Sequence, residues 1–259
     1  MENNGHFCFG TNLCKGPSNY EAMNLKQMDQ YIDFWNLMAY DYTGSWSTYA
    51  GHEANVNAST STPKATPFNT AQAIAYYEKQ GIASTKITLG MPIYGRSFTN
   101  TSGPGGSYSG VGSGTWQPGV WDFKALPLSG ATEHVDSQAV ASYSYDPNQK
   151  MMISYDNVSV AKTKAQYIEN NNLGGAMWWE VSGDKTGSNS LIQTVSSSLL
   201  FIIRFRYLTD IPGLYSIWGK IRYRPDLKSA ELSTVAICQL KEWLPQYFLG
   251  TYCLIVIVL

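Results

Sequence analysis

Charged side chains are scarce in this sequence. They make up 14% of the residues, against about 25% in an average protein, and the formal net charge is −1. A chain without a basic excess has no electrostatic footprint for nucleic acid, so no nucleic-acid partner is expected. Aromatic residues are plentiful instead, with 18 Tyr and 8 Trp. Aromatic faces stack on the C–H groups of sugar rings, so the composition fits a sugar-handling protein or an ordinary charge-poor secreted one.

Cysteine and histidine are also few. No cysteine falls between residues 15 and 237, which excludes a disulfide framework or a Cys-x-x-Cys metal site there. The three histidines lie far apart without metal-ligand spacing. We therefore predict no metal and no cofactor.

Long apolar segments are missing. The first residues, MENNGHFCFG, have neither a basic start nor an apolar run, so we do not expect a signal peptide. Residues 253–259 are apolar but far fewer than the roughly 20 needed to span a bilayer. They could form a buried strand or be an artefact of the gene sequence, and no membrane association is expected. Asn-x-Ser/Thr triplets compatible with secretion begin at Asn57, Asn100 and Asn157.

The composition changes near residue 200. Residues 1–199 contain 11 Lys+Arg and 15 Asp+Glu, whereas residues 200–259 contain 7 and 4. Only Arg96 precedes the change, and four arginines follow it. We treat residues 200–259 as an unrelated tail and predict that they pack poorly on the rest.

Three apolar, aromatic segments before this change predict buried strands: residues 31–41, 86–96 and 174–180. Nearly continuous apolar runs are typical of parallel strands that are covered on both faces. The intervening segments predict helices, so the order indicates βα units.

The first predicted helix is capped by Asn69 or Thr70 and ends at Gly81, with Ala71, Ile74 and Ala75 facing inward. A second runs from Ser159 to the Asn170–Asn172 run, with Val160, Ala165 and Ile168 facing inward, and a third covers residues 188–199. Residues 97–158 interrupt the alternation. They predict a small α+β insertion with a hairpin of residues 140–144 and 151–155, joined through Asp146-Pro147-Asn148-Gln149.

Polar and aromatic residues stand at the ends of all three predicted strands. The ends are Met38-Ala39-Tyr40-Asp41, Tyr94-Gly95-Arg96 and Trp178-Trp179-Glu180. Carboxyl ends of parallel strands form the active site in α/β barrels, so these residues are expected to converge on one pocket. The alternative is that the aromatics only pack the rim of the barrel.

The segment Asp33-Phe34-Trp35-Asn36-Leu37-Met38-Ala39-Tyr40-Asp41-Tyr42, with Gly44-Ser45-Trp46, resembles the sixth barrel strand of family-18 glycoside hydrolases, especially the fungal chitinases. Residues 90–96 (GMPIYGR) are similar to their seventh strand, and residues 174–180 (GGAMWWE) to their eighth. The resemblance covers about residues 16–199. It implies an α/β fold, an incomplete (β/α)8 TIM barrel of about strands 5/6 to 8 with an α+β chitinase insertion. The expected divisions are 1–15 (atypical, with a poor fifth strand), 16–96, 97–158 (insertion), 159–199 and the tail 200–259.

The resemblance also implies roles for six residues. These enzymes hydrolyse β-1,4 N-acetylglucosamine linkages by a retaining, substrate-assisted mechanism in which the substrate's acetamido oxygen attacks the anomeric carbon. Tyr40 would donate its hydroxyl to that acetamido group, and Asp41 would hydrogen-bond the sugar. Trp179 would be the aromatic floor, Arg96 would hold the polar network, and Met38 and Tyr94 would line the pocket.

The family's catalytic acid ends an Asp-x-x-Asp-x-Asp-x-Glu motif, which this sequence lacks. Glu133 and Glu180 are the other acids considered, and neither stands in the required company. We therefore expect a chitinase-family fragment that is inactive alone, with a non-catalytic, lectin-like chitin-binding protein as the alternative. A chain that does not fold alone is a third interpretation. The partner would be chitin or its oligosaccharides, the protein a monomer, and the location extracellular as in the family.

Overall fold

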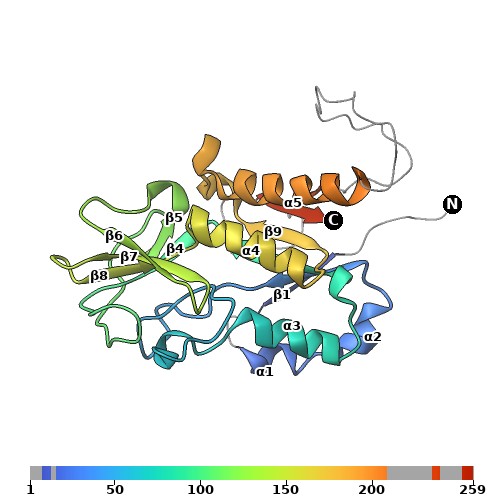
Figure 1. Cartoon of the computed structure of the whole chain (residues 1–259). Coiled ribbons are helices and arrows are strands. Elements are labelled where there is room, and N and C mark those ends of the chain that lie inside the picture. Colours follow the sequence, from blue (N-terminus) through green and yellow to red (C-terminus); the bar gives the residue numbers. More distant parts are fainter. Residues whose placement is uncertain (1–7, 13–15, 209–234, 240–252, 259) are drawn as a thin grey trace.

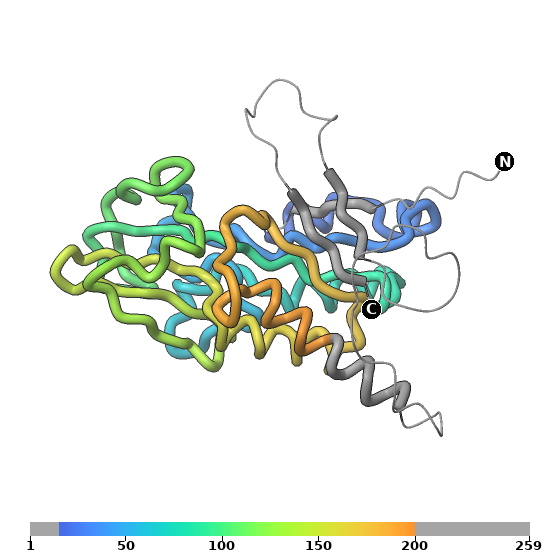
Figure 2. Tube along the Cα trace, turned by 90° about the horizontal axis from the view of Figure 1, so that it is seen from above, coloured from blue at the N-terminus to red at the C-terminus, as the bar shows by residue number. Residues whose placement is uncertain are grey.

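A computed structural model describes residues 8–12, 16–208, 235–239 and 253–258 of the chain. Its strands form two sheets, and helices run along the larger one (Figure 1). Seen from above, the second sheet forms a lobe at one end of the molecule (Figure 2).

The first sheet has the order β1-β2-β3-β9-β11-β10. Its strands are β1 (Cys8–Asn12), β2 (Phe34–Met38), β3 (Ile87–Pro92), β9 (Gly175–Trp179), β10 (Val235–Gln239) and β11 (Cys253–Val258). The strands β1, β2, β3 and β9 pair in parallel, as the alternation of strands and helices predicts. The helices are α1 (Pro17–Tyr20), α2 (Leu25–Asp29), α3 (Thr70–Lys79), α4 (Val158–Asn170) and α5 (Leu191–Leu208).

The second sheet has the order β5-β4-β8-β7-β6 and is antiparallel throughout. Its strands are β4 (Tyr94–Phe98), β5 (Val120–Asp122), β6 (Thr132–Asp136), β7 (Ala141–Asp146) and β8 (Met151–Ser154). The predicted hairpin is confirmed as β7 and β8. Asp146 Oδ1 accepts hydrogen bonds from the backbone N–H groups of Asn148 (2.8 Å) and Gln149 (3.1 Å), which closes the turn.

Residues 86–96 do not form one strand as predicted. They divide at Ile93 into β3 of the first sheet and β4 of the second. The Ile93 N–H donates to the carbonyl of Trp179 (2.8 Å), and the Ile93 carbonyl accepts from the N–H of Phe123 (3.1 Å). Both halves are largely buried, and no turn residue separates them, so the sequence pattern does not mark the change of sheet.

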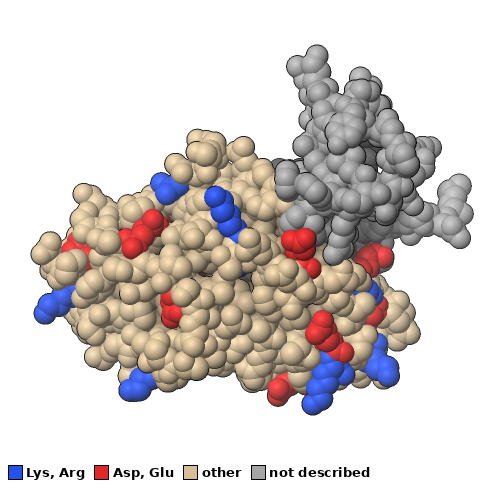
Figure 3. Space-filling view, in the orientation of Figure 1, with Lys and Arg blue, Asp and Glu red and all other residues tan. Residues whose placement is uncertain are grey.

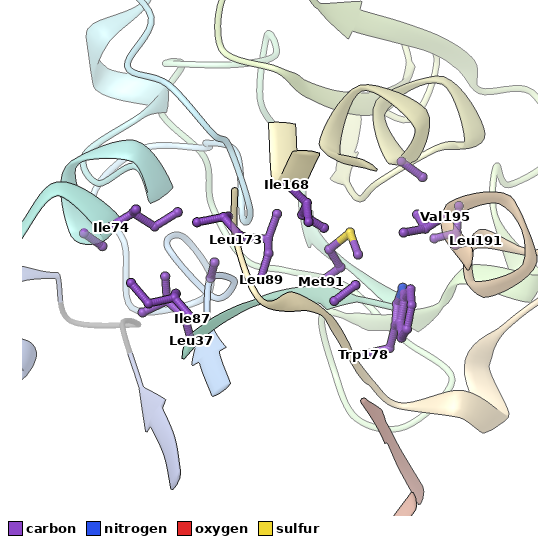
Figure 4. Close-up of a cluster of buried hydrophobic side chains, with 14 of the residues drawn as sticks. Leu37, Ile74, Ile87, Leu89, Met91, Ile168, Leu173, Trp178, Leu191 and Val195 are labelled. Carbon is purple, nitrogen blue, oxygen red and sulfur yellow. The ribbon is translucent and has the colours of Figure 1, made fainter. Parts of the chain in front are cut away.

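Side chains of the parallel strands alternate between two buried layers. Trp35, Leu37, Leu89, Met91 and Trp178 belong to the core beneath the helices, whose members from β3, β9, α3, α4 and α5 meet in Figure 4. Alternate residues point to the other face of the sheet, where a second cluster holds Phe34, Tyr40, Tyr94, Met177 and Trp179. Burial on both faces explains the continuous apolar runs in the sequence.

Two helices begin at asparagines. Asn69 caps α3 by accepting from Gln72 N–H (2.9 Å), as predicted, and Asn157 rather than Ser159 caps α4 by accepting from Val160 N–H (3.0 Å). The inward face of α3 differs from the prediction, because Ala75 is exposed and Ala71 only half-buried. The buried residues of α3 are Thr70, Ala73, Ile74 and Tyr77.

The two ends of the chain also differ from expectation. Residues 8–12, predicted to be a poor strand, form β1 parallel to β2. In the tail, α5 continues to Leu208, and β11 pairs antiparallel with β9 from Ile255–Trp178 to Val258–Gly175. Residues 253–258 therefore add to the first sheet. The rest of the predicted tail, residues 209–234, 240–252 and 259, lies outside the described residues.

Candidate active site

The six predicted site residues come together at the carboxyl ends of the parallel strands. Met38 ends β2, Tyr40 and Asp41 follow it, and Trp179 ends β9. Tyr94 and Arg96 come from β4, the first strand after the division at Ile93. Met38, Tyr40, Tyr94 and Trp179 pack in one cluster with Met177.

Asp41 is the centre of the polar part of the site. Its Oδ1 accepts hydrogen bonds from the Tyr94 hydroxyl (2.7 Å) and from Arg96 Nε (2.6 Å). Asp41 has a φ of 62°, in the left-handed region that Asp tolerates better than most residues. This backbone turns the carboxylate from the end of β2 toward β4, so the ion pair joins the two sheets.

Burial and charge set the protonation states. Burial, followed by the charge of Asp41, raises the pKa of Tyr94 well above its usual value, so the phenol stays protonated and donates. Burial opposes the charged form of Arg96, but its hydrogen bond and charge interaction with Asp41 raise the pKa of the guanidinium. Arg96 is therefore a permanent cation held against one carboxylate.

Tyr40 lies on the apolar side of the site. It is 4% exposed, its ring meets that of Tyr94 edge-on at 6.2 Å, and its hydroxyl lies 4.0 Å from Met177 Sδ. A thioether is a weak acceptor, so this contact contributes little to holding the hydroxyl in place.

Two exposed tryptophans extend the aromatic surface. The Arg96 guanidinium lies 4.7 Å from the ring centre of Trp46, which is 52% exposed. The ring of Trp116, 39% exposed, lies 5.9 Å from that of Tyr94 at an interplanar angle of 31°. Sequence reasoning missed Trp116, which lies in a Gly- and Ser-rich loop without periodicity. It noted Trp46 only as part of a motif.

A third residue that the sequence does not reveal is Glu53. It is fully buried in the loop after β2, where an ionised carboxylate would raise the pKa of both Tyr94 and Arg96. Nothing in Gly51-His52-Glu53 indicates a buried carboxyl.

The two acids considered from the sequence are engaged elsewhere. Glu180, buried, accepts hydrogen bonds from the Ser182 hydroxyl and from the Ser182 N–H (3.3 Å), which begins a short 3-10 turn. Glu133, exposed on β6, accepts from the Tyr155 hydroxyl (2.7 Å), and the strands β8 and β7 separate it from β4.

Among the residues that the structure describes, no group of three or more His, Cys, Asp or Glu side chains could hold a metal ion. Within those same residues, no helix is both long and apolar enough to cross a membrane. On the described part of the face in Figure 3, charged side chains are scattered without a large area of one sign.

Comparison with known proteins gives one family. Residues 11–184 match Glycosyl hydrolases family 18. Chitinase 1 of Aphanocladium album is 47% identical over 194 residues, which cover 75% of this chain and 46% of the relative. The chain thus spans about half the length of the curated relatives that it matches.

Solved structures agree. Chitinase ChiA74 from Bacillus thuringiensis superposes with a TM-score of 0.65 at 28% identity, over 75% of this chain and 35% of the other. YKL-39, solved in the presence of chitooligosaccharides (GlcNAc4), gives 0.68 at 26% identity, over 77% and 59%. These neighbours imply an α/β fold of the TIM-barrel type.

Proposed function

Because this chain belongs to glycosyl hydrolase family 18, we propose that its site binds the N-acetylglucosamine units of chitin and forms part of a chitin-hydrolysing centre. The observation that carries the proposal is the cluster of Tyr94, Arg96 and Asp41 at the carboxyl ends of parallel strands, bordered by exposed aromatic rings. We further propose that β1, β2, β3 and β9 correspond to strands five to eight of the barrel. Residues 97–158 would be the insertion.

The residues divide the work of binding a sugar. The Tyr40 hydroxyl, which lies 4.0 Å from Met177 Sδ, would donate to the acetamido oxygen and orient it toward the anomeric carbon, which is a proximity effect. Asp41 would accept from a sugar N–H or O–H through its carboxylate, which Tyr94 and Arg96 hold in place. Trp179, half-buried at the end of β9, would stack on the apolar face of the ring.

The printed sequence lacks the motif that supplies the proton donor in this family. The departing sugar oxygen must be protonated, and a general acid contributes about 10²–10⁴-fold to the rate. The Asp-x-x-Asp-x-Asp-x-Glu motif is absent, and Glu133 and Glu180 bind other side chains. We propose that this polypeptide hydrolyses chitin oligosaccharides only at background rate.

A second candidate is a non-catalytic chitin-binding protein. It is favoured by the combination of a retained aromatic border and a missing acid motif. In either case the proposed ligand is chitin or a chito-oligosaccharide, and the proposed state is a monomer outside the cell.

Two assays on the purified chain test these proposals. Titration with an N-acetylglucosamine oligomer, followed by tryptophan fluorescence, should show weak binding that Trp179→Ala abolishes and Tyr40→Phe weakens. A fluorogenic oligomer should give no turnover above that of Tyr40→Phe. No binding at all would overturn the proposed ligand. Turnover well above both variants would mean that another residue supplies the proton.

A further inference from the structure

Glu53 is a buried acidic side chain near the site that the proposed binding mode does not use. Its side chain is 0% exposed, and neither carboxyl oxygen has a hydrogen-bond partner among the described residues. A buried carboxylate in this condition would be very costly, and such a group normally pairs or becomes neutral.

The backbone of Glu53 forms hydrogen bonds with two residues, one next to Asp41 and one next to Arg96. Its carbonyl accepts from the N–H of Tyr42 (2.9 Å), the residue after Asp41. Its N–H donates to the hydroxyl of Ser154 (3.1 Å), and Ser154 is the residue opposite Arg96 in the pairing of β4 with β8. Glu53 is thus held beside the pair by two hydrogen bonds that the side chain does not make.

Ionisable groups from several elements influence this carboxyl. Asp41 follows β2, Tyr94 and Arg96 lie on β4, Asp156 follows β8, and Lys164 lies on α4. Burial raises the pKa of Glu53 well above its usual value, Asp41 and Asp156 raise it further, and the two cations oppose the rise. Both cations already have closer acceptors: Asp41 for Arg96 (2.6 Å), and Asp156 (2.6 Å) and the Ala54 carbonyl (2.7 Å) for Lys164.

We infer that Glu53 is an uncharged carboxyl held beside the Asp41–Arg96 pair and is the reserve partner of Arg96. While Asp41 carries the negative charge, Glu53 keeps its proton. Where Asp41 loses its charge, Glu53 releases its proton to solvent and balances the guanidinium. The part of the Asp41–Arg96 pair in sugar binding rests on the proposed function, whereas the charge state of Glu53 does not.

The test is a double-mutant cycle of Glu53→Gln with Asp41→Asn, followed by thermal unfolding at pH 7. In the wild-type background, Glu53→Gln removes a carboxyl that is costly to ionise, so Tm should stay the same or rise. In the Asp41→Asn background, Gln removes the substitute counter-ion, so Tm should fall, with a shift of roughly 2–4 °C. An effect of the same sign and size in both backgrounds would overturn the inference, because a purely structural role does not depend on the charge at residue 41.

A pH series keeps the inference testable if the Asp41→Asn proteins do not fold. The folded pKa of Glu53 is raised, so its stabilising effect is present below the unfolded pKa and is lost as pH rises. The Tm of Glu53→Gln minus that of the wild type should therefore increase from pH 4.5 to 8. The exposed carboxyl of Glu78 on α3 is the matched control, and Glu78→Gln should give no such trend. A flat difference for Glu53→Gln would overturn the inference.

Oligosaccharide binding by the wild-type chain separates the two proposals. If the Tm change caused by Glu53→Gln reverses its sign in the Asp41→Asn background but the chain binds no sugar, the proposed function is rejected and the role of Glu53 stands. Sugar binding without reversal would do the opposite.

Discussion

At the scale of single residues, the buried ion pair of Lys164 and Asp156 connects several elements of the fold. Lys164 on α4 is 1% exposed, and its Nζ donates to Asp156 and to the carbonyl of Ala54, which lies in the loop after β2. This one side chain therefore joins α4, the end of β8 and the loop that carries Glu53.

Replacing Lys164 by Met should leave the Asp156 carboxyl buried without its cation. Removal of one member of a buried pair costs about 3–5 kcal/mol, so the free energy of unfolding in urea should fall by that order. Lys162→Met, an exposed position on the same helix, is the control and should change stability by less than about 0.5 kcal/mol. Equal effects of the two substitutions would contradict the importance of the pair.

The site residues show what the sequence can and cannot predict at this scale. Tyr40, Asp41 and Trp179 were predictable because each ends or follows an apolar strand of recognisable pattern. Their functional roles stay predictions. Glu53 and Lys164 were not predictable, since a buried charge depends on partners from distant elements, and no local periodicity records that.

At the scale of elements, the loop after β2 docks against the second sheet through histidine and aspartate. His52 is 0% exposed, and its Nε2 lies 3.7 Å from Asp136 Oδ2 at the end of β6. The interaction with His52 lowers the pKa of Asp136 to about 2, against the opposing effect of burial.

This contact predicts an acid-sensitive element. A carboxyl with a lowered folded pKa stabilises the protein above its unfolded pKa of about 3.9, and that effect is lost as pH falls toward about 2. The Tm of the wild type should therefore decrease more between pH 5 and pH 2 than the Tm of the Asp136→Asn variant. Parallel curves for the two proteins would show that the contact contributes nothing.

The cap of α3 gives a second prediction at this scale. Asn69→Ala removes the acceptor of the Gln72 N–H and should lower the free energy of unfolding by about 1 kcal/mol. Asn170→Ala, at the exposed end of α4, is the control and should have little effect in the same denaturant titration.

Elements were predictable where one pattern belongs to one element, as in β2, β9 and the hairpin. The prediction was wrong for residues 86–96, because no turn residue or loop marks the change of sheet at Ile93. The sequence offered only a poor strand for residues 8–12 and left a strand at residues 253–259 as one of two alternatives, because strand structure at both places depends on the pairing with β2 and β9.

At the scale of the whole molecule, β11 covers the edge of β9. An uncovered edge presents free backbone groups that pair with other chains. Deletion of residues 253–259 should therefore expose β9 and cause concentration-dependent self-association, measured by light scattering during size-exclusion chromatography. A deletion variant that elutes like the full chain at all concentrations would show that β11 does not protect the edge.

The division at Ile93 has a consequence for recombining this fold with related ones. The natural unit of exchange does not begin at residue 97, where the predicted insertion starts, because Tyr94 and Arg96 already belong to the second sheet. A chimaera joined at residue 97 would divide β4 between the two proteins. Its first residues would come from the recipient, and its partner strands β5 and β8 would come from the donor. A junction at Ile93 transfers β4 together with its partner strands. It also transfers Arg96, which pairs with Asp41. A donor lobe must therefore supply an arginine that can form this ion pair with the aspartate of the recipient.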